Sequence, residues 1–221
     1  MRSMNKRLTP GSVRTRAKTP EGKAEVRKAF IAAGRKLLAS QPHDEVSLRR
    51  IAAEAGYAPG TIYQYFEDYN ALLFAIREVD LERAIDQFEA IAASIDDPVE
   101  RVRALARGSA KYWLQHPDQF DVLFNRPPKD TASNKRAAFG RSPVARRALK
   151  IYYSAVDTLF EALKVSGIPS RLAADTLIAT TYGIVAFPRG TNTMRWSNQY
   201  RMAECAINAI IDSWLGIESP R

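Results

Sequence analysis

The stretch "AGYAPGTIYQYFED" (residues 55–68) places three tyrosines and a phenylalanine within ten positions, directly after a glycine and around a Pro-Gly pair. A buried helix repeats its apolar side chains every three or four residues, and an ordinary surface avoids such a density of rings. The role of this stretch therefore depends on which rings face the interior of the fold and which face solvent.

The sequence around these rings predicts two short helices joined by a tight turn. Ser47 is a favourable N-cap for "SLRRIAAEA", and Gly56 favours the left-handed backbone that ends this helix. Pro59 favours the start of a second helix, which we expect to run to about Phe66. Because a supporting amphipathic helix precedes them at about 21–40, the three helices are typical of a helix-turn-helix unit.

Helical geometry assigns each ring of the second helix to a face. Successive side chains turn by about 100°, so that if Ile62 points inward, Phe66 lies about 40° away and is buried too. The opposite face carries small and polar residues: Gly60, Thr61, Tyr63 and Gln64, with Tyr65 at the boundary. Glutamine bonds adenine at two points, threonine contacts base edges and tyrosine donates to phosphate, which favours insertion into a DNA major groove.

Two further observations bear on this hypothesis. At the start of the first helix, Ser47 and Arg49 are placed to contact phosphate together with free backbone N–H groups. Taken alone, however, "TIYQYF" fits a locally packed aromatic helix about as well. The glycine turn before it and the basic residues upstream favour the DNA-binding interpretation.

The net charge is concentrated near the N-terminus. The chain carries +9 at neutral pH. Residues 1–20 contain six basic and no acidic side chains, and residues 21–66 contain seven basic and five acidic ones, so eight of the nine net charges lie in the first 66 residues. This asymmetry predicts a polyanion-binding head on a nearly neutral body. For residues 1–20 alone, a solvated tail without a partner is the alternative.

Residues 24–73 resemble the DNA-binding domain of the TetR family of bacterial transcriptional regulators. The resemblance runs through "SLRRIAAEAGYAPGTIYQYF" and "FEDYNALL", where the family usually has Phe, two residues, Lys-Glu, one residue and Leu. It implies a homodimer whose two heads bind successive major grooves of a near-palindromic double-stranded operator. The usual phosphate-contacting lysine is Tyr69 here, which implies a weaker contact. The arm residues Arg14, Arg16 and Lys18 are placed to compensate by binding the backbone or the minor groove.

The rest of the chain has helical periodicity and no clear strand alternation, which predicts an all-α fold of about nine helices. We expect helices at about 69–94, 98–116, 143–166, 170–187 and 197–215, with a mobile loop at 125–143. Three parts follow: a basic flexible arm (1–20), a three-helix helix-turn-helix domain (21–68) and a larger helical domain (69–221). The family resemblance implies that the larger domain binds a small-molecule effector and forms the dimer.

Two groups of residues are candidates for these roles. Seven aromatic residues on the middle helices are either plain core or the lining of an apolar effector pocket: Tyr112, Trp113, Phe120, Phe124, Tyr152, Tyr153 and Phe160. The last helix is apolar over so much of its circumference that we expect it to pack on its own domain and on a symmetry mate. With the 170–187 helix it predicts a dimer interface containing Leu177, Ile184, Ala203, Ile207, Ile210 and Trp214.

Several function classes are disfavoured. The chain lacks a Walker loop, a GxSxG elbow and metal-spaced His/Cys clusters, so we expect no enzyme activity, no metal and no cofactor. Its single cysteine, Cys205, excludes an internal disulfide framework, and no apolar run is long enough to span a membrane, which predicts a cytoplasmic protein. The favoured function is an effector-released repressor. The alternatives are an effector-independent regulator and a charge-driven nucleoid-type binder.

Overall fold

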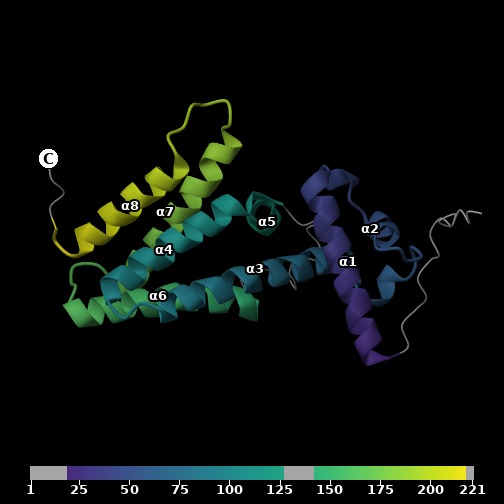
Figure 1. Cartoon of the computed structure of the whole chain (residues 1–221), viewed down its shortest axis with the longest axis horizontal. Helices are drawn as coiled ribbons and strands as arrows, with labels where there is room; N and C mark the ends of the chain where they lie inside the picture. Colours follow the sequence, from purple (N-terminus) through teal and green to yellow (C-terminus); the bar gives the residue numbers. More distant parts are fainter. Residues whose placement is uncertain (1–18, 127–141, 218–221) are drawn as a thin grey trace, which may run out of the picture. The chain divides into compact units, whose positions relative to one another are not determined.

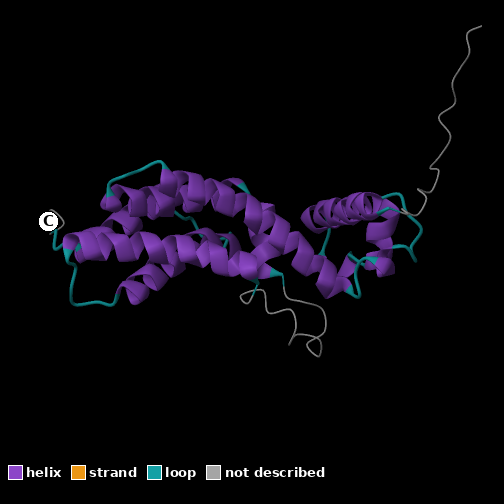
Figure 2. Cartoon of the chain, turned by 90° about the horizontal axis from the view of Figure 1, so that it is seen from below, coloured by secondary structure: helices purple, strands orange, loops and turns teal. Residues whose placement is uncertain are grey.

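The computed structural model describes residues 19–126 and 142–217, and these residues contain no strand (Figures 1 and 2). The α-helices are α1 (Pro20–Ser40), α2 (Leu48–Glu54), α3 (Tyr69–Ala93), α4 (Pro98–Gln115), α5 (Pro117–Phe120), α6 (Pro143–Leu163), α7 (Ser170–Gly190) and α8 (Gln199–Trp214). Three short turns are η1 (His43–Glu45), η2 (Ile62–Gln64) and the π-helical η3 (Asp121–Asn125). The all-α prediction is confirmed. The described residues hold eight α-helices instead of about nine, because the segment at 59–66 forms only the 3₁₀ turn η2.

The described chain divides into two compact units. The first runs to Arg77 and includes Phe124–Arg126, and the second holds Glu78–Leu123 and the described residues from Ser142 onward. Helix α3 therefore contributes its first two turns to the first unit, although the sequence predicted a division at residue 69. Residues 1–18 of the expected arm (1–20) and most of the loop predicted at 125–143 lie outside the described residues, whereas Thr19 caps α1 and Pro20 begins it.

The first unit is built around α1, α2 and the start of α3. Phe30, Ile51 and Ile62 are completely buried, and Phe66 is only 3% exposed. The start of α3 approaches α1 so closely that a Cβ atom at Gly34 would lie 2.9 Å from the Cδ1 atom of Ile76. The unit therefore has a continuous apolar core that η2 shares.

Helix α4 is the centre of the second unit, where it packs against α6, α7 and α8. The later turns of α3 join the same core through buried residues that include Ile85 and Phe88. On the opposite side of α4, the guanidinium of Arg103 donates to Asn208 (2.9 Å) and pairs with Asp212, both on α8. Arg103 is only 9% exposed and Asp212 is partly exposed, so this partly buried ion pair links the last helix to the centre of the unit.

The sequence placed the end of the seventh helix before Pro188, but α7 continues through Pro188 to Gly190. A proline lacks the N–H group that would bond the carbonyl four residues earlier, and this loss normally ends a helix. Here the Nε2 atom of Gln199, at the start of α8, donates to the carbonyl oxygen of Ile184 (2.9 Å). A side chain from the next helix therefore replaces the missing backbone donor, which is a tertiary effect that local sequence rules do not contain.

Within the described ranges, no helix combines the length and the hydropathy that crossing a lipid bilayer requires.

The core of the first unit predicts a large effect on stability for one of two neighbouring substitutions and almost none for the other. Ile62→Ala should lower the free energy of unfolding by about 2–5 kcal/mol, because the lost side chain is completely buried. Gln64→Ala should change it by no more than about 0.5 kcal/mol, since that side chain is exposed. Urea denaturation followed by circular dichroism measures both. Equal effects of the two variants would contradict the assigned orientation.

The bond between Gln199 and Ile184 can be tested by a double-mutant cycle. Gln199→Ala should lower the free energy of unfolding by about 1 kcal/mol, because the Ile184 carbonyl loses its donor. In a Pro188→Ala background the same change should have almost no effect, since residue 188 then supplies a backbone N–H. Equilibrium denaturation of all four proteins gives the coupling energy. A coupling energy of zero would mean that Gln199 does not compensate for the proline.

Candidate nucleic-acid interface

Helix α2 begins as the sequence predicts. Ser47 has extended backbone, and its hydroxyl accepts a hydrogen bond from the N–H of Arg50 (3.3 Å). The guanidinium of Arg50 turns back to the carbonyl oxygen of Glu45 (2.9 Å) and pairs with the carboxylate of the same residue (3.5 Å). Arg49 is exposed and makes no ion pair within the described residues. The first turn of α2 thus presents one uncompensated guanidinium beside an exposed hydroxyl.

The turn after α2 is a Schellman motif. Gly56 has a φ of 80°, its N–H bonds the carbonyl of Ala53 (3.0 Å), and the N–H of Tyr57 bonds the carbonyl of Ala52 (2.9 Å). Tyr57 is 8% exposed, and its ring centroid lies 5.2 Å from that of Phe30 on α1. The ring of Tyr57 therefore packs the turn against the supporting helix α1.

The segment after the turn is not the α-helix that the sequence predicted. Only Ile62–Gln64 is regular, as the 3₁₀ turn η2. The N–H groups of Thr61, Gln64 and Tyr65 bond carbonyls three residues earlier. Two local features explain the difference. The segment starts with a Pro-Gly pair, which supplies a poor helix former, and no side chain caps it, since Ala58 occupies the position before Pro59.

The predicted facing of the side chains is nevertheless confirmed. Ile62 (0% exposed) and Phe66 (3%) point inward, while Tyr63 (52%) and Gln64 are exposed. Tyr65 is half-buried, and its ring meets Phe30 edge-on at 5.5 Å. The buried rings therefore pack one side of the segment against α1. The other side of the segment is polar and open to solvent.

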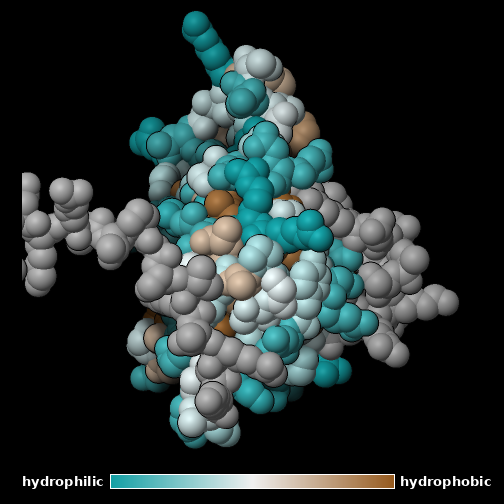
Figure 3. Space-filling view, turned by 90° about the vertical axis from the view of Figure 1, so that its right-hand side faces the viewer, coloured by the Kyte–Doolittle hydropathy of each residue, from teal (hydrophilic) through white to brown (hydrophobic). Residues whose placement is uncertain are grey.

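The open side of this segment consists of Gly60, Thr61, Tyr63 and Gln64, of which Thr61 is partly buried and the others are exposed. At Gly60 an added Cβ atom would meet no protein atom within 4 Å, and the backbone there is not left-handed. The fold itself therefore does not require glycine at this position. The face of the molecule shown in Figure 3 is mainly hydrophilic, with isolated hydrophobic side chains between the polar ones.

Tyr69, the first residue of α3, is half-buried beside two arginines. Burial raises the pKa of its phenol to about 12, against the opposing effect of the charges of Arg126 and Arg77. The hydroxyl is therefore neutral at physiological pH. Arg77 donates to the carbonyl oxygen of Arg126, and Arg126 donates to that of Leu38 near the end of α1. The predicted phosphate contact at Tyr69 thus has a partly buried, uncharged donor. The predicted arm contacts Arg14, Arg16 and Lys18 lie outside the described residues.

Arg27 on α1 was not predicted as a site residue. Its side chain is exposed, and the guanidinium carbon lies 5.1 Å from the centroid of the Phe66 ring. This position puts a cation over the ring of Phe66, which lies on the buried side of the segment around η2. The signal was present in the sequence, because Arg27 precedes the buried Phe30 by three residues and so shares its side of α1.

Most of the predicted pocket aromatics lie in the buried core of the second unit. Trp113 meets Tyr112, Phe120 and Phe88 edge-on, with ring centroids 4.9, 6.0 and 6.3 Å apart. Tyr152 and Phe160 are also buried, and burial raises the pKa of the Tyr152 phenol to about 12.

The other two predicted pocket residues lie elsewhere. Tyr153 is half-exposed, and its hydroxyl donates to the carboxylate of Asp175 (2.8 Å). Phe124 is corrected, because it belongs to the first unit and is 42% exposed, so it does not line a pocket in the second. The π-helical turn Asp121–Asn125 carries it out of the helical register from which it was predicted.

The predicted dimer residues divide into two sets. Leu177, Ala203 and Ile207 are at most 3% exposed within the monomer, so they have no surface to offer a partner and are corrected to core residues. Ile184, Ile210 and Trp214 keep part of their surface. Sequence periodicity identified the apolar stripe of α8 but not which edge of it faces α4.

A shallow groove with a volume of about 710 Å³ lies along the outer edge of α7 and α8. Small and flexible side chains line it, and only Ile184 among them was predicted: Thr180, Ile184, Ser197, Asn198, Arg201, Met202, Cys205, Ala206 and Ala209. The signal that was missed is the spacing of Met202, Ala206 and Ala209 beside the stripe of Ala203, Ile207 and Ile210. Among the described side chains, no group of three or more His, Cys, Asp or Glu residues gathers as a metal site.

Sequence comparison places this geometry among known proteins. The family model of the bacterial regulatory proteins of the tetR family matches residues 30–76. The HTH-type transcriptional repressor Rv1474c of Mycobacterium tuberculosis is 30% identical over 100 residues, or 45% of this chain and 46% of that protein. The HTH-type transcriptional regulator SAB2452 of Staphylococcus aureus is 28% identical over 118 residues, or 53% and 60%. Each alignment thus spans less than two-thirds of the relative's length.

Solved structures share the fold over almost the whole chain. The transcriptional regulator FadR of Bacillus subtilis, solved with stearoyl-CoA, superimposes with a TM-score of 0.67 at 15% identity, covering 87% of this chain and 99% of that one. A TetR/AcrR-family regulator of Thermobifida fusca superimposes with a TM-score of 0.63 at 21% identity, covering 89% and 100%. Residues 30–76 thus match the tetR family of bacterial regulatory proteins, and the solved structures show that the chain shares their fold.

Proposed function

We propose that this protein is a sequence-specific, DNA-binding regulator of transcription that acts as a homodimer. The observation that carries the proposal is the two-sided segment around η2, where Ile62 and Phe66 are buried while Tyr63 and Gln64 are exposed. Burial fixes the backbone, so the polar side chains are held ready for base edges. An exposed glutamine pairs with adenine through two hydrogen bonds in the major groove.

Gly60 supports the same proposal. The fold leaves room for a side chain at this position and does not use the special backbone freedom of glycine. Close approach of another molecule is the remaining physical reason for a missing side chain, and a major groove would supply one. Arg27 on α1 and Arg49 on α2 are exposed cations of the same unit, and such side chains suit phosphate contacts.

The basic N-terminal residues add affinity that does not depend on sequence. Eight of the nine net positive charges of the chain lie in the first 66 residues, and each cation that binds a phosphate releases a counterion. Because the proposed partner is chromosomal DNA, the proposed location is the cytoplasm. A charge-driven nucleoid-type binder would show the same salt dependence, but it would lack a preferred sequence.

The dimer is proposed to form through the groove on α7 and α8. Its residues are mostly small or flexible, Ile184 is among them, and Ile210 on α8 is also partly exposed. A two-fold pairing of this face would carry two copies of η2, which must lie about 34 Å apart to enter successive major grooves. The protein would then recognise an operator with matching two-fold symmetry.

The dimer is further proposed to be a repressor that a small molecule releases from DNA. The structural relative from B. subtilis was solved with stearoyl-CoA, which makes the second unit the place to look for an effector here. Its buried aromatic cluster contains two hydroxyl groups, of which that of Tyr112 donates to Gln119 (3.0 Å). Helix α3 runs through both units, so a ligand that moved its later turns would also move its first turns. If no ligand changed operator affinity, the effector-independent alternative would hold.

The base-reading role of Gln64 can be tested by selecting bound sequences from random DNA. Gln64→Ala should lose the preference for one base pair in each half-site, with discrimination there falling about tenfold, and should bind other sequences as before. The matched control is Gln87→Ala, an exposed glutamine on α3. A Gln64→Ala protein that selects the same operator with the same preference would refute the assignment.

The proposed dimer face can be tested with a charge. Ala206→Arg should yield a monomer in light scattering after size-exclusion chromatography, because a guanidinium pair at a two-fold axis is buried without counter-charges. Operator affinity should fall by about 100-fold or more as the two heads separate. Ala90→Arg, on an exposed face of α3, should leave both properties unchanged. A dimeric Ala206→Arg protein would place the interface elsewhere.

A further inference from the structure

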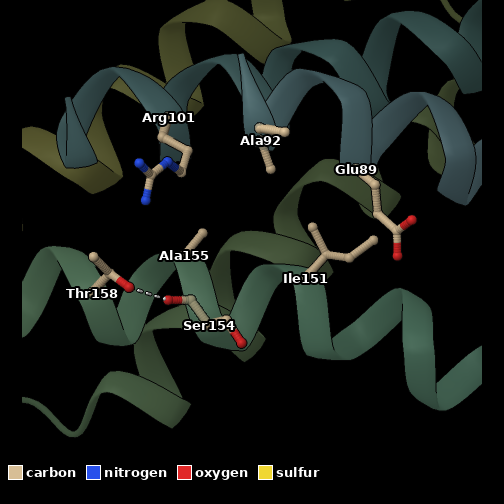
Figure 4. A pocket seen from close by; sticks show the side chains of 8 residues that line it. Glu89, Ala92, Arg101, Ile151, Ser154, Ala155 and Thr158 are labelled. Carbon is tan, nitrogen blue, oxygen red and sulfur yellow. Dashed lines mark hydrogen bonds between the residues drawn. The ribbon is translucent and has the colours of Figure 1, made fainter. Parts of the chain in front are cut away.

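A second cleft lies between the end of α3, the first turn of α4 and the middle of α6, all within the second unit (Figure 4). Its volume is about 340 Å³, and it is shallow and open to solvent. Eight residues line it: Glu89, Ala92, Ala93, Arg101, Ile151, Ser154, Ala155 and Thr158. None of them belongs to the aromatic cluster or to the groove on α7 and α8.

Small side chains produce this cleft. Ala92 on α3 and Ala155 on α6 point toward each other across the gap, and Ile151 points into it from α6 (Figure 4). Methyl groups in these positions leave space that larger side chains would fill. The middle of the cleft is therefore apolar and suits a hydrocarbon body.

A fixed cation stands at one end of the cleft. The Nε atom of Arg101 donates to the carbonyl oxygen of Ile95 (2.8 Å), and its Nη2 atom donates to that of Asp96 (3.1 Å). These bonds hold the guanidinium in place but do not neutralise it, and Arg101 forms no salt bridge within the described residues. An arginine has five N–H donors, so the group keeps donors for an anion.

Two carboxylates around the cleft are paired with arginines, whereas Asp97 caps α4 and the exposed Asp96 forms no salt bridge within the described residues. At the far end, Glu89 accepts from the Nε atom of Arg147 (2.8 Å) and pairs with it a second time. Beside Arg101, the carboxylate of Asp97 accepts from the N–H of Glu100 (2.8 Å), and Glu100 itself pairs with Arg103 (3.6 Å). The α4 end of the cleft thus holds a guanidinium that forms no salt bridge within the described residues, near the carboxylates of Asp96 and Asp97.

We propose that this cleft binds a small amphipathic carboxylate, with its charged group on Arg101 and its apolar body between Ala92, Ile151 and Ala155. A carboxylate matches the planar fork of a guanidinium, and the apolar body displaces water from methyl-lined walls. The hydroxyl of Thr158 bonds the backbone oxygen of Ser154 (2.8 Å) and offers the ligand no donor. Recognition therefore depends on one charge and on shape. The inference does not rest on the proposed DNA-binding function.

The probe for this proposal is octanoate, compared with 1-octanol and octylamine on the full-length protein by isothermal titration calorimetry at low salt. Octanoate should bind, octanol should bind about tenfold more weakly, and octylamine should not bind. In ¹H–¹³C spectra of protein labelled at alanine and isoleucine methyl groups, octanoate should shift the signals of Ala92, Ile151 and Ala155.

Two variants and two controls decide the location. Arg101→Gln should weaken octanoate binding about tenfold or more by removing the cation, and Ala92→Leu should weaken it as much by filling the cleft. The matched controls are Arg83→Gln and Ala90→Leu, both exposed on α3 and outside the cleft. They should bind octanoate within about twofold of the unchanged protein. Circular dichroism confirms that each variant is folded.

The proposal is overturned if octanoate does not bind, if octanol binds as tightly as octanoate, or if either Arg101→Gln or Ala92→Leu retains full affinity. Because these titrations contain no DNA, failure here leaves the proposed regulatory function intact. Loss of operator binding by Gln64→Ala would equally leave this site untouched.

Discussion

The left-handed backbone at Gly56 is the constraint on which the first unit depends. It lets α2 stop within one residue and turns the chain back, with the N–H of Tyr57 on the carbonyl of Ala52. A residue with a Cβ atom would be strained at this φ of 80°. The turn then presses the ring of Tyr57 onto Phe30, and this contact sets how the following segment meets α1. The polar face of that segment is a consequence of the turn.

The second unit depends on close helix contacts of a different kind. Helices α3 and α4 approach so closely that a Cβ atom at Gly108 would lie 2.4 Å from the Cδ1 atom of Ile91. Helix α7 survives an internal proline because Gln199 of the next helix bonds the carbonyl of Ile184. Both features hold long helices side by side, and the clefts on the surface of the unit occur where small side chains interrupt this packing.

Sequence reasoning succeeded where a single residue type has one physical use. Ser47 caps α2, Gly56 takes a positive φ, and the inward direction of Ile62 and Phe66 follows from their four-residue spacing. It failed at η2, because an α-helix was assumed where the Pro-Gly start supports only a tighter turn. The predicted directions of the side chains were still right. Residues 62 and 64 lie on different sides of the segment both in a 3₁₀ helix and in an α-helix.

Local signals thus determined from sequence alone that the chain is all-helical, that its N-terminal part is a helix-turn-helix unit with a polar outer face, and that its positive charge lies there. Only the tertiary structure decided which edge of α8 is core, since Ala203 and Ile207 pack inward while Ala206 borders an outer groove. Only it showed the partners of Gln199 and Arg101. The physical reason is the distance along the chain over which each kind of interaction acts. Caps, turns and periodicity act within one or two turns of chain, whereas the choice between two apolar edges depends on helices far away in sequence.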